Sequence, residues 1–79
     1  MKYVMFKRCE EHVPIIFPET LVHADVAKWM LNGRRLGPVH SAGFISPVTM
    51  ECHGRSESLG VYSDPEDTDR IRGGLFPRF

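Results

Sequence analysis

A run of small and polar residues, Gly54-Arg55-Ser56-Glu57-Ser58, comes close to the G-x-S-x-G pattern in which hydrolases present a nucleophilic serine. Ser58 stands where the pattern has its last glycine, which allows the strained turn between strand and helix. The chemistry also needs a histidine and an acid from distant loops of a large sheet, which 79 residues cannot supply. We therefore expect Ser56 to be structural, within a polar strand that exposes Arg55 and Glu57, and we do not expect an enzyme.

Thiol and imidazole groups are the second set that could do chemistry, because a structural zinc ion would stabilise so small a domain. The candidates are Cys9, His12, His40, Cys52 and His53. Cys9 and His12 have the spacing of half a site, but the adjacent Cys52 and His53 would point to opposite faces of a strand. We expect a buried Cys52, exposed histidines and no metal or other cofactor. Without CxxC spacing the two cysteines are expected to be reduced, and a single bridge between them is the alternative.

Four carboxylates gather towards the C-terminus, at Asp64, Glu66, Asp67 and Asp69. They lack the glycine and the terminal glutamate of an EF-hand loop, so the pattern does not predict calcium binding. Ser63 followed three residues later by Glu66 is typical of a capped helix start, where carboxylates are favourable without any ion.

The charge balance argues against polyanionic partners and membranes. Ten basic residues offset ten acidic ones, which removes the long-range field that nucleic-acid and anionic-membrane binding usually need. A small nucleic-acid-associated regulator is for this reason only the alternative function. It requires the fold to gather the dispersed basic residues on one surface. No apolar run reaches the roughly 18 residues of a membrane-spanning helix, and charges interrupt the N-terminus where a signal peptide is apolar. We expect a cytoplasmic protein.

The N-terminal third predicts a hairpin. Lys2 to Arg8 and His12 to Phe17 are short runs rich in strand formers. Pro14 has no N–H to give to a ladder, so the second strand is either an edge strand or begins at Ile15.

The main helix is predicted from about Thr20 to Leu31, where apolar residues recur at helical spacing. Asn32-Gly33 then provides a typical C-terminal stop. We place Trp29 and Met30 in the core, with part of the indole exposed because the domain is so small.

A second hairpin is predicted from Val39 to Ile45 and from Val48 to His53, around a tight turn at Ser46-Pro47. Apolar residues occupy even positions before Gly54 and odd positions after it. This phase change predicts a bulge or a bend near Gly54.

The C-terminal part predicts a short helix from Ser63 to about Arg72, followed by an apolar tail at residues 73–79. The phenylalanines of this tail, Phe76 and Phe79, either fold back onto a sheet or dock on a partner. A small domain with open sheet edges suits such contacts.

Several segments resemble a group of short, uncharacterised proteins encoded by bacteriophages and prophages. These are the opening MKYVMFK, FPETLVHADVA, SAGF, and above all HGRSESLG followed by DPED. The resemblance spans most of residues 1 to 67. It implies a bacterial or phage cytoplasmic setting, in which small accessory proteins often bind and block host machinery, and it brings no active site with it.

Together these patterns predict one small α+β domain over residues 1–79. Two β-hairpins form an antiparallel sheet, with one main helix packed on it and a short C-terminal helix. An apolar content of 42% and a charged content of 25% are ordinary for a globular chain.

The function that we expect is protein–protein binding by a non-enzymatic phage or prophage accessory protein. It could inhibit a host or defence factor, and it could form a homodimer. The predicted contact residues are Arg55, Glu57, Phe76 and Phe79. Besides the nucleic-acid regulator, the remaining alternative is a small domain stabilised by a metal ion.

Overall fold

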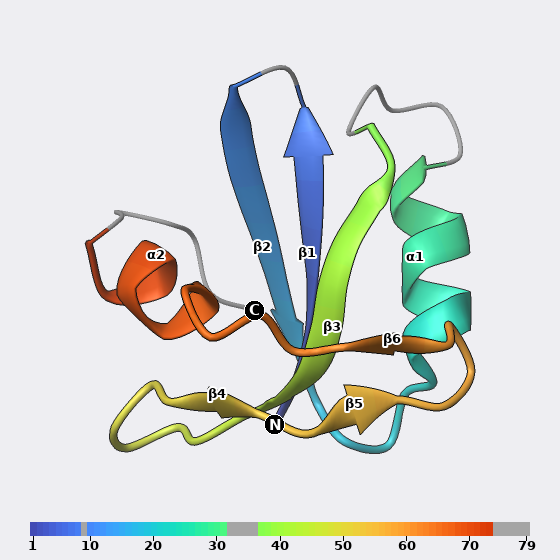
Figure 1. Cartoon of the computed structure of the whole chain (residues 1–79). Helices are drawn as coiled ribbons and strands as arrows, with labels where there is room; N and C mark the ends of the chain where they lie inside the picture. Colours follow the sequence, from blue (N-terminus) through green and yellow to red (C-terminus); the bar gives the residue numbers. More distant parts are fainter. Residues whose placement is uncertain (9, 32–36, 74–79) are drawn as a thin grey trace.

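Four antiparallel strands form the main sheet in the order β2-β1-β3-β4 (Figure 1). Its strands are β1 (Lys2–Arg8), β2 (Glu11–Phe17), β3 (Val39–Ile45) and β4 (Cys52–His53). A second, two-stranded sheet consists of β5 (Arg55–Ser56) and β6 (Val61–Tyr62), and the helices are α1 (His23–Leu31) and α2 (Asp67–Gly73). The computed structural model describes residues 1–8, 10–31 and 37–73. The predicted α+β fold, with its hairpins, main helix and short C-terminal helix, is confirmed.

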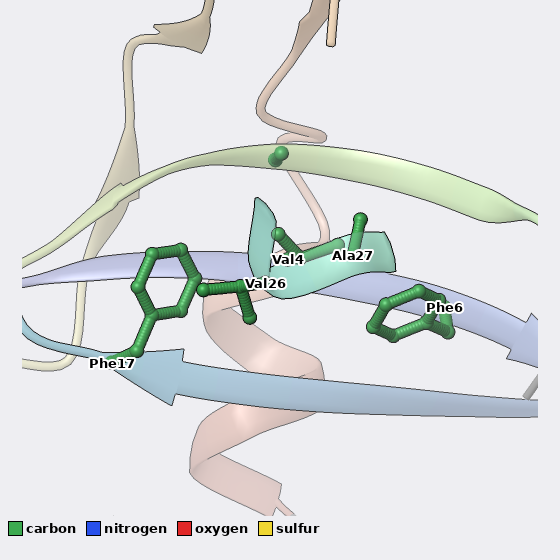
Figure 2. Packing of buried hydrophobic residues seen from close by; sticks show 6 residues of the cluster. Val4, Phe6, Phe17, Val26 and Ala27 are labelled. Carbon is green, nitrogen blue, oxygen red and sulfur yellow. The ribbon is translucent and has the colours of Figure 1, made fainter. Parts of the chain in front are cut away.

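Strand β1 is the centre of the fold and is covered on both faces. Its residues Tyr3, Val4, Met5 and Phe6 have 0% exposure. Val4 and Phe6 pack against α1 (Figure 2), whereas Tyr3 and Met5 pack with Ile71 of α2. Because successive side chains of a strand point to opposite faces, α1 and α2 cover opposite faces of the sheet. This explains why the sequence of β1 is continuously apolar and does not alternate.

The first hairpin follows the prediction, and Pro14 lies in the edge strand β2 opposite Met5. Met1, directly before β1, exchanges backbone hydrogen bonds of 3.1 and 2.8 Å with Ile45 of β3. Odd-numbered residues of β1 therefore direct their backbone groups towards β3, and even-numbered ones towards β2. The nitrogen of Pro14, opposite an odd-numbered residue, consequently faces away from β1. The open edge has no N–H at its middle, which discourages pairing with another strand.

Helix α1 begins at His23, three residues later than predicted from Thr20. The prediction that Trp29 belongs to the core is wrong, because its exposure is 55%. Val26 and Ala27 face the sheet, and Trp29 is turned away from Val26 by about 60° around the helix, onto its flank. Neither α1 nor α2 is long and apolar enough to cross a membrane, and the described residues contain no other helix.

The second hairpin is shorter than predicted. Strands β3 and β4 pair only at Phe44↔His53 and Ile45↔Cys52. Placing Val48 in a strand was wrong, since its exposure is 88% and it lies in a wide turn closed by a 3.0 Å bond from Ser46 N–H to Glu51 O.

The predicted bend at Gly54 is confirmed. Its φ of 78° lets the chain leave the main sheet and enter β5. After this bend Leu59 and Val61 pack against the cluster under α1, which accounts for the change of apolar phase.

Candidate functional site

Asp64 caps the turn that leads into α2. Its Oδ1 accepts a 2.9 Å hydrogen bond from Glu66 N–H, and its own N–H donates to Asp67 Oδ2 at 3.1 Å. This reciprocal pair is a capping box, with Pro65 at the first position, where a helix needs no N–H. The predicted cap, Ser63 with Glu66 as its partner, is therefore wrong by one residue.

Asp67 is fully buried and stands at the centre of a polar cluster, the Asp67 cluster. Its members are Tyr3, His40, Ser41, Asp64, Asp67 and Arg70. Asp67 Oδ2 accepts hydrogen bonds from the hydroxyls of Tyr3 at 2.6 Å and Ser41 at 2.5 Å. Its Oδ1 accepts from Arg70 Nη1 at 3.0 Å. These donors, with the N–H of Asp64, compensate for removing the carboxylate from water.

A bulge in β3 brings His40 into this cluster. Met5 pairs with Ser41 but Phe6 pairs with Val39, so His40 is the extra residue. A bulge redirects a side chain, and His40 Nε2 here lies 2.7 Å from Asp64 Oδ2.

The ionisation states in the cluster follow from these contacts. Hydrogen bonds from the Glu66 N–H and from His40 lower the pKa of Asp64 to about 2, so its carboxyl group is ionised. Burial, followed by the hydrogen bond to Asp67, raises the pKa of Tyr3 far above its usual range. The phenol therefore keeps its proton and acts as a donor.

The Asp67 cluster has the spacing of a metal site but already contains a cation. Ligand atoms of His40, Asp64 and Asp67 lie within 4.8 Å of one another. Arg70 Nη1 lies 3.3, 3.1 and 3.0 Å from these three side chains in turn. Since the guanidinium is always charged, a metal ion placed here would be repelled by it. Arg70 is the cation that pairs with both carboxylates.

The groups considered for zinc lie in different surroundings. The rings of His12 and His40 lie edge to face with their centres 4.9 Å apart. His53 stacks on Phe44, with the ring centres 6.1 Å apart. Cys52 is half-buried, and burial raises the pKa of its thiol to about 11. Cys9 lies outside the described residues, and so does any bridge between the two cysteines.

Ser56 and Ser58 hold the turn between β5 and β6. Ser56 is 1% exposed, and its hydroxyl accepts a 3.1 Å bond from Leu59 N–H. Ser58 Oγ accepts from Ala24 N–H at 3.1 Å and so caps α1 from 34 residues away. This distant cap is needed because Val22, whose carbonyl accepts from Val26 N–H, has no side-chain acceptor.

Beside this turn a groove of about 470 Å³ opens at the surface. It is lined by Lys2, Val22, His23, Phe44, Gly54, Arg55, Glu57 and Ser58. A second hollow of about 310 Å³ is lined by Arg55, Ser56, Glu57, Gly60, Val61 and Tyr62. Arg55 and Glu57 belong to both, so the pair separates two concave surfaces. Sites that bind ligands typically have volumes of about 300 to 1,000 Å³.

The polar groups of the groove are unequally matched. Lys2 Nζ donates to the carbonyl of Leu21 at 2.8 Å, and it forms no ion pair with a carboxylate of the described residues. Arg55 pairs with Glu57 at 3.3 Å. Nε2 of His23 lies 2.8 Å from the carbonyl oxygen of Gly43, so the hydrogen of the ring is on Nε2. Burial lowers the pKa of this ring, which disfavours a second proton on Nδ1. His23 is therefore neutral near pH 7, and Lys2 gives the groove its excess charge.

Two of the residues predicted as contacts, Arg55 and Glu57, lie together at this surface, with side-chain exposures of 57% and 83%. Phe76 and Phe79 lie outside the described residues. Sequence reasoning missed Lys2, Val22 and Phe44, which it assigned only to a strand or to an apolar stripe. No local signal marks them, because they come from β1, from β3 and from the residue before α1.

No protein-family model, no curated protein and no solved structure matches this chain. The groove and the Asp67 cluster therefore provide the basis on which a function can be inferred.

Proposed function

We propose that this protein is a non-enzymatic protein-binding module that uses the two hollows on either side of the Arg55–Glu57 pair. The observation that carries this proposal is the exposure of apolar surface there. Val22 at the groove is 45% exposed, and Tyr62 at the second hollow is 63% exposed. The Arg55 guanidinium lies 5.9 Å from the centre of the Tyr62 ring. Tyrosine and arginine are the residues that most often dominate binding at protein interfaces.

A binding role also accounts for where the reactive side chains lie. In the Asp67 cluster, Asp67 has 0% exposure and Ser41 has 2%, so a substrate would not reach them. In the groove, the hydroxyl of Ser58 is already used as a cap, and Nε2 of His23 is used by a carbonyl. Catalysis would require a base within hydrogen-bond reach of a nucleophile and of a substrate.

The proposed setting is the cytoplasm of a bacterial host cell, where the protein acts as a phage or prophage accessory factor. The resemblance of HGRSESLG and DPED to short phage proteins supports this setting. The partner is a protein of the host or of the phage. If it belongs to the host, it is a host or defence factor that this protein inhibits. A homodimer is a form in which the same surface could be used.

The test is an affinity pull-down of the tagged full-length protein from bacterial lysate, with mass spectrometry of the retained proteins. The test variant is Arg55→Ala/Glu57→Ala. A matched control, Arg72→Ala/Glu51→Ala, removes another exposed arginine–glutamate pair, 4.0 Å apart, from the α2 side of the molecule.

We expect a stoichiometric partner that the wild type and the control retain and the test variant loses. A partner retained equally by all three proteins would show that the contact surface lies elsewhere. No stoichiometric partner, together with a monomeric protein in solution, would contradict the proposed function itself.

A further inference from the structure

We infer that the groove binds an acidic peptide segment, with a partner carboxylate on Lys2 and an adjacent apolar side chain on Phe44. This inference rests on the proposed function and specifies the chemistry of the partner. It follows from three features: an ammonium group that no carboxylate of residues 1–8, 10–31 and 37–73 pairs with, an aromatic wall, and a rim on which Glu57 adds a negative charge.

Lys2 supplies the position for the carboxylate. Its ammonium group has three donors, of which the 2.8 Å bond to Leu21 O uses one. This bond is partly buried and fixes the end of a side chain that would otherwise be flexible. A fixed ammonium group loses less conformational freedom when it binds an anion, which favours binding.

Phe44 supplies the apolar contact next to that position. The centre of its ring lies 5.9 Å from that of His23, with the two rings nearly perpendicular, and 6.1 Å from that of His53, with the two rings stacked. A Cβ at Gly54 would lie only 3.1 Å from Cδ2 of Phe44, so the absence of a side chain keeps this part of the wall accessible. Val22, which is 45% exposed, extends the apolar surface. An aromatic or aliphatic side chain of a peptide would fit against these groups.

The rim distinguishes a peptide from a nucleic acid. Glu57 is 83% exposed and offsets Arg55, so the groove has an excess of one positive charge, from Lys2. A single carboxylate matches this excess. A nucleic acid carries one negative charge per nucleotide, so it would bring further phosphates to a groove that Glu57 also lines. The chain as a whole has zero formal charge, which gives a polyanion no further attraction.

The experiment selects a random peptide library against the full-length protein and then measures the best peptide by fluorescence polarisation. We expect selected peptides to carry Asp or Glu next to Leu, Ile or Phe. Lys2→Met should weaken binding about fivefold, which corresponds to roughly 1 kcal/mol. Lys2→Arg should retain binding, because it keeps the charge. Lys28→Met is the matched control, since Lys28 is exposed on α1 but does not line the groove.

A second arm leaves the protein unchanged, so that it applies even if Lys2→Met does not fold. In it the acidic residue of the selected peptide is replaced by its amide, and we expect the same loss of about fivefold. Selected peptides without acidic residues, or an affinity unaffected by both replacements, would overturn this inference and leave the proposed function standing. Tighter binding of a single-stranded oligonucleotide than of the peptide at low salt would overturn it in favour of a nucleic-acid partner. A failure to select any peptide, together with a pull-down that yields no partner, would refute both.

Discussion

The replacement Asp67→Asn is the most direct test of how the fold is held together. Asparagine has nearly the same shape, so it changes the charge and the hydrogen-bond chemistry of the cluster with little effect on packing. The amide oxygen can still accept from the hydroxyls of Tyr3 and Ser41. The amide N–H₂ would replace Oδ1, however, and would place donor against donor at Arg70, now 3.0 Å from that oxygen.

The size of the effect follows from the bonds that change. A hydrogen bond to a charged group contributes about 1.5 to 3 kcal/mol and a neutral one about 0.5 to 1.5 kcal/mol. Asp67→Asn removes one charged bond and converts three others to neutral ones, those from Tyr3 at 2.6 Å, Ser41 at 2.5 Å and the N–H of Asp64 at 3.1 Å. Arg70 keeps Asp64 and Glu66, which reduces the loss. We expect the free energy of unfolding to fall by about 3 kcal/mol, out of a total of roughly 4 to 12 kcal/mol for a chain of this length.

Urea unfolding followed by circular dichroism measures this change. The matched control is Asp69→Asn, which removes an exposed carboxylate from the same helix and should alter stability by no more than about 0.5 kcal/mol. The melting temperature should fall by roughly 10 to 25 °C in Asp67→Asn and hardly at all in the control. If the two variants were equally stable, the reasoning that assigns Asp67 a central structural role would be refuted.

Three further predictions concern other parts of the chain. Ser58→Ala should lower the free energy of unfolding by about 0.5 to 2 kcal/mol through loss of the cap on α1, again by urea unfolding; a loss no greater than for the exposed Thr20→Ala would contradict the cap. Burial lowers the pKa of His12, so below the ordinary value of 6.5 the unfolded chain binds a proton that the folded chain does not, and the free energy of unfolding should fall. It should fall again below about pH 4, because the pKa of Asp64 is about 2 in the folded chain and its carboxyl group is protonated first in the unfolded chain. If the free energy of unfolding, measured by urea unfolding, did not change between pH 7 and pH 3, both assignments would be contradicted. Deleting residues 76–79 should weaken self-association or partner binding more than it harms folding, measured by analytical ultracentrifugation and pull-down, and an unchanged oligomeric state with unchanged partner binding would refute this.

The elements that depend on neighbouring residues could be predicted from the sequence, and those that depend on distant contacts could not. The first hairpin, the main helix and the bend at Gly54 each follow from a local apolar pattern. The exposure of Trp29 depends on how α1 is rotated about its axis on the sheet. Periodicity shows that the helix has an apolar face, but it does not show which part of that face contacts the sheet. The cap of α2 was misplaced because Ser63 and Asp64 are both good caps, and Pro65 decides between them.

The candidate site was predicted only where its residues are close in sequence. Arg55 and Glu57 are two residues apart and lie on either side of the buried Ser56, as the predicted polar strand requires, although the strand ends at Ser56 and Glu57 already belongs to the turn. Lys2 joins them through tertiary structure, which no local pattern indicates. The same holds for the Asp67 cluster, in which Tyr3 and Asp67 are 64 residues apart.

The separation of 64 residues between Tyr3 and Asp67 has a consequence for folding during synthesis on the ribosome. Strand β1 is synthesised before the other described elements, yet Asp67, the partner of its Tyr3 hydroxyl, lies in α2, which follows all of them. A nascent chain that ends before α2 would leave the Tyr3 hydroxyl without its Asp67 acceptor and the apolar sheet face around Met5 uncovered. Folding of this domain should therefore be completed only after α2 has left the ribosome, and chains that stop before α2 would be substrates for chaperones and proteases rather than partial versions of the domain.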